Sequence, residues 1–499
     1  MLSVSVLDAP ASGFCAPSMP FAAILVPPGR EGDWIFCAPN GLWDLLFSAS
    51  VFRLVILSRT NPKGDIDDNG CGHADDCNGD VLVNNGNIHG HSHVVNNGDG
   101  GDSNVHVDDV DGHINDKNDC DVSFKQEILP LLHCLFPWRH FPHGPPSDPF
   151  VTYEDGVRDR SVVEIKYSSA LGEILVEDIE LDDENRILLR RRMRFRNMPN
   201  LIQTEVPIIF YKDGNPEPNC SLKDVKVERN NPHSIQRALE VRPDHSEIVH
   251  KYLPSIIAGL ILASPSLEAC MLSRNRVRVL SIGLGGGALP IFLRRKFEFH
   301  VLAVDMDETV VDLARRHFGL EEDDHLQVKI QDGVDVVVGI AKRVIRSGTL
   351  TLENLNKWRQ LTVDQDECIC VDSSREDDEV DARMHVIVLD VDAGNACLGL
   401  LSPPSSFLTR IFLLGARIAL HVGGVLVMNV IPRDDHNLKI VTDALHEFFD
   451  GIYQIRHDAN HVLFALASRV EDLDLGCSFA TKVMQVVDTE LLDRIEEIA

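Results

Sequence analysis

Residues 277–289, VRVLSIGLGGGAL, place a run of apolar residues directly before a cluster of glycines. The run from Val277 to Ile282 has the composition of a buried strand, and the glycines extend from Gly283 to Gly287. A helix is predicted from Ala288 to Lys296. Because glycine has no Cβ, a strand–turn–helix unit of this kind lets the backbone approach a bound ligand closely. We therefore predict an α/β fold with a ligand at the carboxyl end of this strand.

Three further strand-like segments follow, and each of them ends in an acidic residue. They are Phe299–Val304 before Asp305, Leu326–Gln331 before Asp332-Gly333, and His385–Leu389 before Asp390-Val391-Asp392. Asp305 follows Gly283 by 22 residues, where an acid can accept both ribose hydroxyls of an adenosine cofactor. Open α/β sheets bind ligands at the carboxyl ends of their strands. The glycine turn alone suits a dinucleotide equally well, but the ordered set of acids favours S-adenosylmethionine.

Further motifs extend this pattern along most of the chain. The full set is Val279–Leu289 (VLSIGLGGGAL), Ala303–Asp307 (AVDMD), Gln331–Gly333 (QDG), Leu389–Asp392 (LDVD), Ser402–Pro404 (SPP), Asn429–Asp434 (NVIPRD), Leu25–Trp34 (LVPPGREGDW) and Asn200–Glu205 (NLIQTE). Together they resemble the spermidine-synthase-like branch of class I methyltransferases. More closely, they resemble the C-terminal domain of the methyltransferase-like protein 13 family, which modifies translation elongation factor 1-alpha at its N-terminal amine. The resemblance runs from about residue 20 to 470, apart from inserted segments.

The resemblance implies a Rossmann-like, seven-stranded class I methyltransferase fold with a smaller β-rich N-terminal subdomain. It implies methyl transfer from S-adenosylmethionine to a protein amine, either the N-terminal α-amine or a lysine of a translation elongation factor. It also assigns the cofactor contacts to Gly283, Gly285, Gly287, Asp305, Met306, Asp332, Gly333, Asp390 and Gln203. Some of these residues have simpler alternatives, because Gly287 could only begin a helix and Asp332-Gly333 could only form a turn.

Asp390, Asp392 and Asn429 are the candidate catalytic residues, since an attacking amine must be oriented and must lose a proton. An α-amine with a pKa near 8 is partly neutral at cellular pH, unlike a lysine. Asp392 is expected to face the substrate. The alternative for Asp392 is a turn residue whose carboxylate caps a backbone amide.

Two features depart from the family pattern. The family protein carries a second, N-terminal methyltransferase domain that modifies a lysine, and this chain has no second glycine motif for it. Glu247 also follows Asp244-His245-Ser246 where an aromatic residue is expected. Three rival functions therefore stay open: a polyamine aminopropyltransferase, a non-catalytic scaffold and an NAD-dependent dehydrogenase. The first is disfavoured because the loop Asp390–Asn395 has two acids and no serine, and the last by Asp332-Gly333 and Asp390–Asp392.

Composition divides the chain into four predicted parts. Residues 1–60 are expected to form an α/β segment, and 61–125 a disordered acidic insert rich in Asp, Asn, Gly and His. Residues 126–245 are expected to form the β-rich subdomain with an insert at 212–242. Residues 246–499 are expected to form the S-adenosylmethionine-binding domain, with an acidic insert at 347–381.

The charge and cysteine patterns exclude several classes of partner. The formal net charge is -30, and Gly64–Asp121 alone holds 14 Asp, no Glu and one Lys, which argues against a nucleic-acid partner. No uncharged apolar run of about 18 residues predicts a membrane span. The 12 cysteines lack metal spacing, and the calcium-loop-like Asp65–Asp76 lacks its terminal Glu, so no metal site is predicted. A cytoplasmic location and a possible homodimer are further expectations.

Overall fold

The structure is a computed structural model with side chains. It describes residues 2–9, 19–26, 45–46, 49–59, 104–107, 119–154, 156–183, 186–195, 198–212, 214–216, 240–250, 252–348, 352–362, 382–393, 400–432, 434–457, 460–470 and 475–498, together with Phe36, Leu42, Leu222 and Leu473. The chain divides into two compact units, one formed by residues 1–94 and 102–155 and the other by 95–101 and 156–499. The calcium-loop-like stretch Asp65–Asp76 lies outside the described residues.

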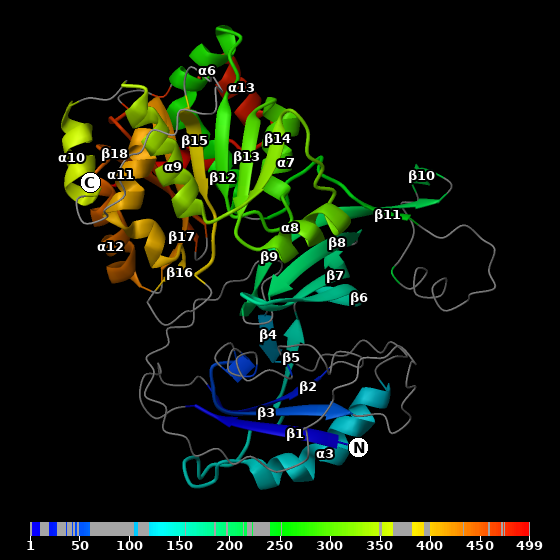
Figure 1. Ribbon diagram of the computed structural model, residues 1–499. Helices are drawn as coiled ribbons and strands as arrows, with labels where there is room; N and C mark the ends of the chain where they lie inside the picture. The colour runs from blue at the N-terminus through cyan, green and yellow to red at the C-terminus, as the bar shows by residue number, and fades with distance from the viewer. Residues whose placement is uncertain are drawn as a thin grey trace. The chain divides into compact units, whose positions relative to one another are not determined.

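The N-terminal unit is a five-stranded sheet with helices (blue to cyan in Figure 1). Its elements are β1 (Leu2–Asp8), β2 (Met19–Leu25), β3 (Val51–Arg59), β4 (Asn104–Val107), α3 (Asp119–Leu135) and β5 (Phe150–Glu154). The strand order is β1-β3-β2-β5-β4, and β2 runs parallel to both neighbours. Central strand β2 is buried on both faces: Phe21 packs in one core with α3, and Ile24 packs in a second core with Leu45.

Two predicted boundaries are wrong in this region. Strand β4 and the first turns of α3 lie inside 61–125, which was expected to be disordered. Helix α3 and β5 also belong to the N-terminal unit and not to the β-rich part that was expected to begin at 126. The physical reason is burial: Ile128, Leu132 and Phe136 cover Phe21 on β2, so this sheet depends on a helix far along the chain.

The second unit begins with an antiparallel sheet. It contains β6 (Val157–Ser168), β7 (Gly172–Asp183), β8 (Arg186–Phe195), β9 (Met198–Lys212), β10 (Asn215–Pro216) and β11 (Glu240–Pro243). The order is β10-β9-β8-β7-β6, with β11 also pairing with β9. The arginine-rich stretch forms β8, where buried Arg191 and Arg192 pair with Asp178 and Glu205 of the neighbouring strands. Of the predicted insert 212–242, only Lys212, residues 214–216, Leu222 and residues 240–242 are described.

A mixed sheet of nine strands forms the rest of this unit. It contains β12 (Arg278–Ile282), β13 (His300–Asp305), β14 (Leu326–Ile330), β15 (Met384–Leu389), β16 (Leu400–Ser402), β17 (Leu420–Pro432), β18 (Gly451–His457), β19 (Asn460–Leu466) and β20 (Glu496–Glu497). The order is β14-β13-β12-β15-β17-β19-β18-β20, with β16 on β17. The predicted α/β fold is confirmed. Seven strands were expected, whereas the mixed sheet contains nine.

Helices cover both faces of the mixed sheet (Figure 1). One core contains α5 (Leu253–Gly259), η1 (Leu260–Ala263), α6 (Ser264–Leu272), α7 (Ala288–Phe297), α13 (Ser478–Met484) and α14 (Glu490–Asp493). The other contains α9 (Gly333–Arg346), α10 (Leu352–Thr362), η3 (Ser405–Leu408), α11 (Arg410–Ala419) and α12 (Asp435–His446). Helix α10 lies within 347–381, which was predicted to be an insert. Its Trp358 is buried in this core, so the prediction is wrong for that part.

The helical run Leu253–Leu272 is long and apolar enough to cross a membrane by length and composition. However, 61% of its most apolar 18-residue window is buried. Ile256, Leu260 and Leu267 pack in the same core as Val279 and Val301 of the sheet. The run therefore has the surroundings of a core helix.

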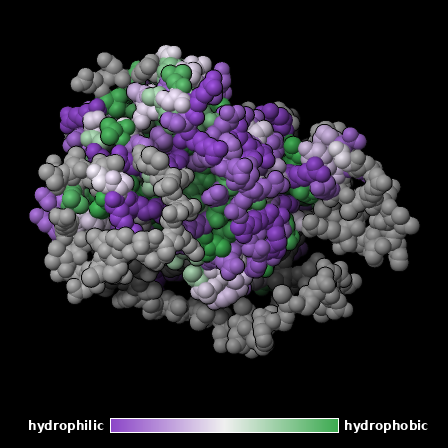
Figure 2. All heavy atoms as spheres, turned by 45° about the horizontal axis from the view of Figure 1, so that its top comes forward, coloured by the Kyte–Doolittle hydropathy of each residue, from purple (hydrophilic) through white to green (hydrophobic). Residues whose placement is uncertain are grey.

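On the face shown in Figure 2, hydrophilic residues predominate and apolar residues form separate groups.

Helix α8 (Glu308–His317) joins the antiparallel sheet to the mixed sheet. Its Val310 and Leu313 pack with Ile174 and Val176 of β7, while the opposite side of the helix faces the core of the mixed sheet. Charged contacts reinforce this packing: Lys166 bonds to Asp312, and Glu164 accepts from Arg316 and contacts His317. The two sheets thus form one unit, with the carboxyl ends of β12, β13 and β15 beside β9.

Candidate functional site

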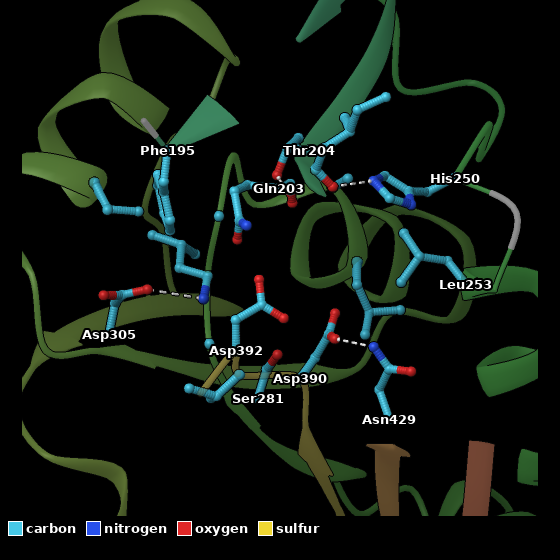
Figure 3. Close-up of a pocket in the computed structure, with 18 of the residues that line it drawn as sticks. Phe195, Gln203, Thr204, His250, Leu253, Ser281, Asp305, Asp390, Asp392 and Asn429 are labelled. Carbon is cyan, nitrogen blue, oxygen red and sulfur yellow. Dashed lines mark hydrogen bonds between the residues drawn. The ribbon is translucent and has the colours of Figure 1, made fainter. Parts of the chain in front are cut away.

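A pocket lies where the carboxyl ends of the parallel strands meet the antiparallel sheet (Figure 3). The mixed sheet supplies the glycine turn after β12 and the residues that end β13, β15 and β17. The antiparallel sheet supplies β9 and the turn between β6 and β7. The polar residues that line it are Gln203, Thr204, His250, Tyr252, Ser281, Asp305, Asp307, Asp390, Asp392, Asn429 and Asn460. Of the four strand ends that were predicted to meet at one site, those of β12, β13 and β15 line this pocket, whereas Asp332 after β14 does not.

Most backbone N–H groups of the glycine turn donate hydrogen bonds to other atoms of the protein. Four of the five amides of residues 283–287 donate hydrogen bonds: Gly283 to the Val304 carbonyl at 2.9 Å, Leu284 to Asp305 Oδ2 at 3.0 Å, Gly286 to Thr204 Oγ1 at 2.6 Å and Gly287 to the Leu284 carbonyl at 2.8 Å. A pyrophosphate group requires free amides at such a turn. This turn is accordingly better suited to a ligand without phosphates.

Asp305 ends β13 and faces the glycine turn. Its two carboxylate oxygens accept the Leu284 amide and, at 2.9 Å, the Asp307 amide. Burial raises the pKa of the Asp305 carboxyl, and the nearby Asp307 adds to the rise, while the backbone amides oppose it. Each carboxylate oxygen has a second lone pair, so Asp305 can still accept hydroxyl groups of a ligand.

Asp390 is held by hydrogen bonds to both of its carboxylate oxygens. The Tyr252 hydroxyl donates to Oδ2 at 2.8 Å, and the Asn429 side-chain amide donates to Oδ1 at 2.9 Å. The Asn460 amide in turn donates to Asn429 Oδ1 at 2.8 Å, which fixes which end of Asn429 faces the acid. The carboxylate of Asp390 is therefore oriented by Tyr252, which precedes α5, and by Asn429 of β17, which is held in turn by Asn460 of β19. Figure 3 shows the bond between Asn429 and Asp390.

Nε2 of Gln203, from β9, and Oγ of Ser281, from β12, are buried polar atoms of pocket-lining residues. Neither has a hydrogen-bond partner among the described residues. Buried polar groups in proteins are normally hydrogen-bonded, so both atoms point to a polar ligand at this place. Asp392 lies in the same pocket, close to the ends of β12 and β15 (Figure 3).

The pocket is acidic. Asp305, Asp307, Asp390 and Asp392 line it, and its described lining residues include neither lysine nor arginine. His250 lines it as well, and its Nε2 bonds to the Ile202 carbonyl at 3.1 Å. Among the described residues, no group of three or more His, Cys, Asp or Glu is placed to hold a metal ion. The electrostatics favour cationic groups in the pocket.

Three predicted cofactor residues lie outside the pocket lining. Asp332 is the N-cap of α9, where its carboxylate accepts the Val334 amide at 2.7 Å, and it is exposed. Gly333 is the buried first residue of α9, and Gly287 is the N-cap of α7. Gly287 thus begins a helix, as its simpler alternative stated, whereas Asp332 caps a helix and does not form the turn that was its alternative. Contact between the cofactor and these three residues stays a prediction.

Tyr252, Asn460 and Thr204 were not predicted from the sequence as residues of the site. An aromatic residue was expected at Glu247, which is exposed and does not line the pocket, whereas Tyr252 five residues later contacts Asp390. Tyr252 lies directly before an apolar helix, and this position next to a predicted element could have indicated it as a candidate. Asn460 and Thr204 act through side-chain contacts to Asn429 and Gly286, and no local pattern in their strands indicates these contacts.

No protein-family model matches the chain. Among curated proteins, the eEF1A lysine and N-terminal methyltransferase of Xenopus laevis is 24% identical over 467 residues, covering 92% of this chain and 52% of that protein. The Homo sapiens protein of the same name is 26% identical over 332 residues, covering 65% and 41%. The matched region spans about half the length of these relatives or less.

Solved structures give a similar picture. Human methyltransferase-like protein 13 in complex with SAH is 24% identical with a TM-score of 0.35, covering 48% of this chain and 92% of that one. A probable spermidine synthase from Corynebacterium glutamicum is 14% identical with a TM-score of 0.36, covering 65% and 85%. The names of the curated relatives agree with the class of protein that the sequence motifs resemble.

Proposed function

We propose that the chain is an S-adenosylmethionine-dependent methyltransferase that acts on a protein amine. The observation that carries the proposal is the pocket, where the glycine turn, Asp305, Asp390 and Asp392 meet at one sheet edge. The names of the curated relatives support the same activity. They also support an elongation factor, through its N-terminal α-amine or a lysine, as the acceptor. A cytoplasmic location and a homodimer belong to this proposal and rest on the family resemblance.

The residues of the pocket fit the cofactor. Asp305 has free lone pairs for ribose hydroxyls, and Met306, which is 68% exposed beside it, offers an apolar surface for the base. The unpartnered Gln203 Nε2 and Ser281 Oγ offer a donor and a hydroxyl to the polar groups of the ligand. The internal hydrogen bonds of the glycine turn disfavour an NAD-type pyrophosphate.

When bound, the cofactor supplies a methyl group that is already activated by a sulfonium. The protein then has to orient the amine in line with that group and receive its proton. Asp390, fixed by Tyr252 and Asn429, provides a rigid acceptor for one N–H of the amine. Asp392, in the same pocket, is the proposed proton acceptor.

An α-amine suits this site better than a lysine. With a pKa near 8, roughly a tenth of α-amines are neutral at pH 7, against well under a thousandth of lysines. An acidic pocket attracts the ammonium form, so removal of its proton is the step that needs a base. The N-terminus of a protein is also an extended segment that can enter a pocket between two sheets.

The alternatives are a polyamine aminopropyltransferase and a scaffold that binds the cofactor without catalysis. The acidic pocket is compatible with a polyamine, which is why the acceptor has to be tested directly. The loop after β15 contains Asp390 and Asp392 but no serine, which disfavours the polyamine reading.

The test uses the full chain, S-adenosylmethionine labelled in its methyl group, and recombinant elongation factor 1-alpha with a free or an acetylated N-terminus. We expect label on the free form and its loss on the acetylated form, with an Asp305→Ala variant inactive on both. Equal labelling of both forms would place the methyl group on a lysine. A parallel reaction contains decarboxylated S-adenosylmethionine and a polyamine. Release of methylthioadenosine with a lengthened polyamine in that reaction, and no labelled protein in the first, would overturn the proposal in favour of the first alternative.

A further inference from the structure

We propose that Thr204 is a positioning residue for the cofactor, because its hydroxyl clamps the glycine turn from the neighbouring sheet. The inference rests on the proposed cofactor but not on the identity of the methyl acceptor. Thr204 lies on β9, and only 4% of it is exposed. Its Oγ1 accepts the Gly286 amide at 2.6 Å and donates to the Gln203 carbonyl at 2.7 Å.

The shape of the glycine turn shows how closely it fits this threonine. A Cβ on Gly285, which has a φ of 52°, would lie 2.4 Å from Thr204 Oγ1. A Cβ on Gly286 would lie 2.6 Å from Thr204 Cγ2 and 2.7 Å from a ring carbon of Phe318. A side chain at position 285 would therefore clash with Thr204, and one at position 286 with both Thr204 and Phe318. Glycine at 285 and 286 therefore serves the contact with Thr204, and Gly285 in addition lines the pocket where its contact with the cofactor is predicted.

The hydrogen bond between Thr204 and Gly286 affects the width of the pocket. Gln203, next to Thr204, directs its unpartnered Nε2 into the pocket, and Ile202 lines it from the same strand. A fixed Thr204–Gly286 bond therefore sets the distance between the Gln203 side and the glycine-turn side of the pocket. Loss of the bond leaves a buried amide unsatisfied and frees the turn to move against β9.

A second contact holds the same sheet against the site. The buried hydroxyl of Ser168 donates to Asp307, and the same oxygen accepts the amides of Ala170 and Leu171 at 3.1 Å. Ala170 and Leu171 line the pocket. The Ser168–Asp307 bond therefore also holds the antiparallel sheet at the pocket, whereas Thr204 bonds to the glycine turn itself.

The experiment compares Thr204→Val, which keeps the shape but removes the acceptor, with Thr204→Ser, which keeps the hydroxyl. Val206→Ala is the matched control, because Val206 is buried on the same strand but lies outside the pocket. Binding of S-adenosylhomocysteine to the full chain is measured by calorimetry, and exchange of the Gly286 amide is measured without ligand. We expect Thr204→Val to weaken binding about tenfold and to speed exchange, and Thr204→Ser to stay within about threefold of the wild type.

Val206→Ala is expected to lower the melting temperature and to leave the dissociation constant unchanged. Faster Gly286 exchange in Thr204→Val with an unchanged dissociation constant would overturn the positioning role alone. Equal loss of binding in Thr204→Val and Val206→Ala would reduce Thr204 to a packing residue. Absence of binding by the wild type would instead overturn the proposed function, and the role of Thr204 with it.

Discussion

The hydroxyl of Tyr252 donates to Asp390 Oδ2 at 2.8 Å, although the two residues are 138 positions apart. Tyr252 directly precedes α5, and Asp390 directly follows β15, so the bond joins a helix on one face of the sheet to the edge that carries the site. It occupies one carboxylate oxygen of Asp390 while Asn429 occupies the other. The orientation of the proposed amine-binding acid thus depends on a residue outside the parallel strands.

Tyr252→Phe removes one of the two hydrogen bonds that orient Asp390. Such a bond to a charged group contributes about 1.5–3 kcal/mol, so kcat should fall by about ten- to a hundredfold. Binding of S-adenosylhomocysteine should change little, because Tyr252 acts on the acceptor side. Steady-state kinetics with the elongation factor, together with calorimetry, separate the two effects.

The matched control is Tyr453→Phe. The Tyr453 hydroxyl accepts the Val470 amide at 2.8 Å, and the residue does not line the pocket. This variant should lower the melting temperature and keep kcat. If Tyr252→Phe lost stability but retained full kcat, its hydroxyl would be structural and the orienting role of Tyr252 would be wrong.

Asn460→Asp should be more harmful to catalysis than Asn460→Ala. The native Asn460 amide donates to Asn429 Oδ1 and so leaves the Asn429 amide facing Asp390. A carboxylate at 460 cannot donate, and it favours a flipped Asn429 whose oxygen would face Asp390. We expect a fall of about threefold in kcat for the alanine variant and about tenfold or more for the aspartate variant.

Kinetics of both Asn460 variants at one pH check this order, and melting temperatures serve as the control. The reverse order would mean that Asn460 only fills space at the end of β19. A double variant with Tyr252→Phe should lose less than the product of the single effects, since both residues act through the same carboxylate.

The parts of the fold that the sequence predicted are those with local signals. Val277–Ile282 and the glycines after it predicted β12 and its turn, and the acids at 305, 390 and 392 predicted the edge where the pocket lies. These signals are local because strand burial and glycine turns depend on neighbouring residues. The N-terminal boundaries failed for the opposite reason, since α3 packs on β2 across about a hundred residues.

Only the part of the site with local signals was predicted from the sequence. An acid at the end of a strand can be recognised from its position, but its hydrogen-bond partners cannot, and nothing in the sequence around Asn460 indicates a bond to Asn429. Gly285 lines the pocket, and its contact with the cofactor stays a prediction. Its second role could not be predicted from the sequence, because the atom that a Cβ at 285 would meet is Thr204 Oγ1 of the other sheet.

Asp178→Ala should strongly destabilise the second unit. Arg191 and Asp178 form a two-bond pair at 2.7 and 2.9 Å, both side chains are buried, and Arg191 also donates to the His317 carbonyl at 2.9 Å. Removal of the acid leaves a buried guanidinium without its counter-charge, which costs about 3–5 kcal/mol in the free energy of unfolding.

Urea unfolding of the full chain, followed through the transition of this unit, measures that loss. Lys439→Ala is the control, because Lys439 and Asp443 form an exposed pair one helical turn apart. The urea midpoint of this variant should not change. Joint replacement of Arg191 and Asp178 by Met and Leu should recover much of the loss. An unchanged midpoint for Asp178→Ala would show that water reaches Arg191.

The affinity for S-adenosylhomocysteine should depend on pH through Asp305. Burial raises the pKa of this carboxyl in the free protein, and ribose hydroxyls that donate to it favour its charged form. Binding therefore releases a proton at pH values below the raised pKa. Affinity should rise with pH, by up to about tenfold per unit, and level off once pH exceeds that pKa, which lies above the usual aspartate value near 3.9.

Calorimetry of the wild type and of Asp305→Asn across this range tests the sign and the assignment. The asparagine variant should bind more weakly at neutral pH, and its affinity should lack this slope, because the amide keeps an acceptor but does not titrate. Any slope that survives in the variant belongs to the other acids of the pocket. A wild-type affinity that falls as pH rises would mean that the ligand prefers protonated Asp305, and the proposed ribose contact would have to be abandoned.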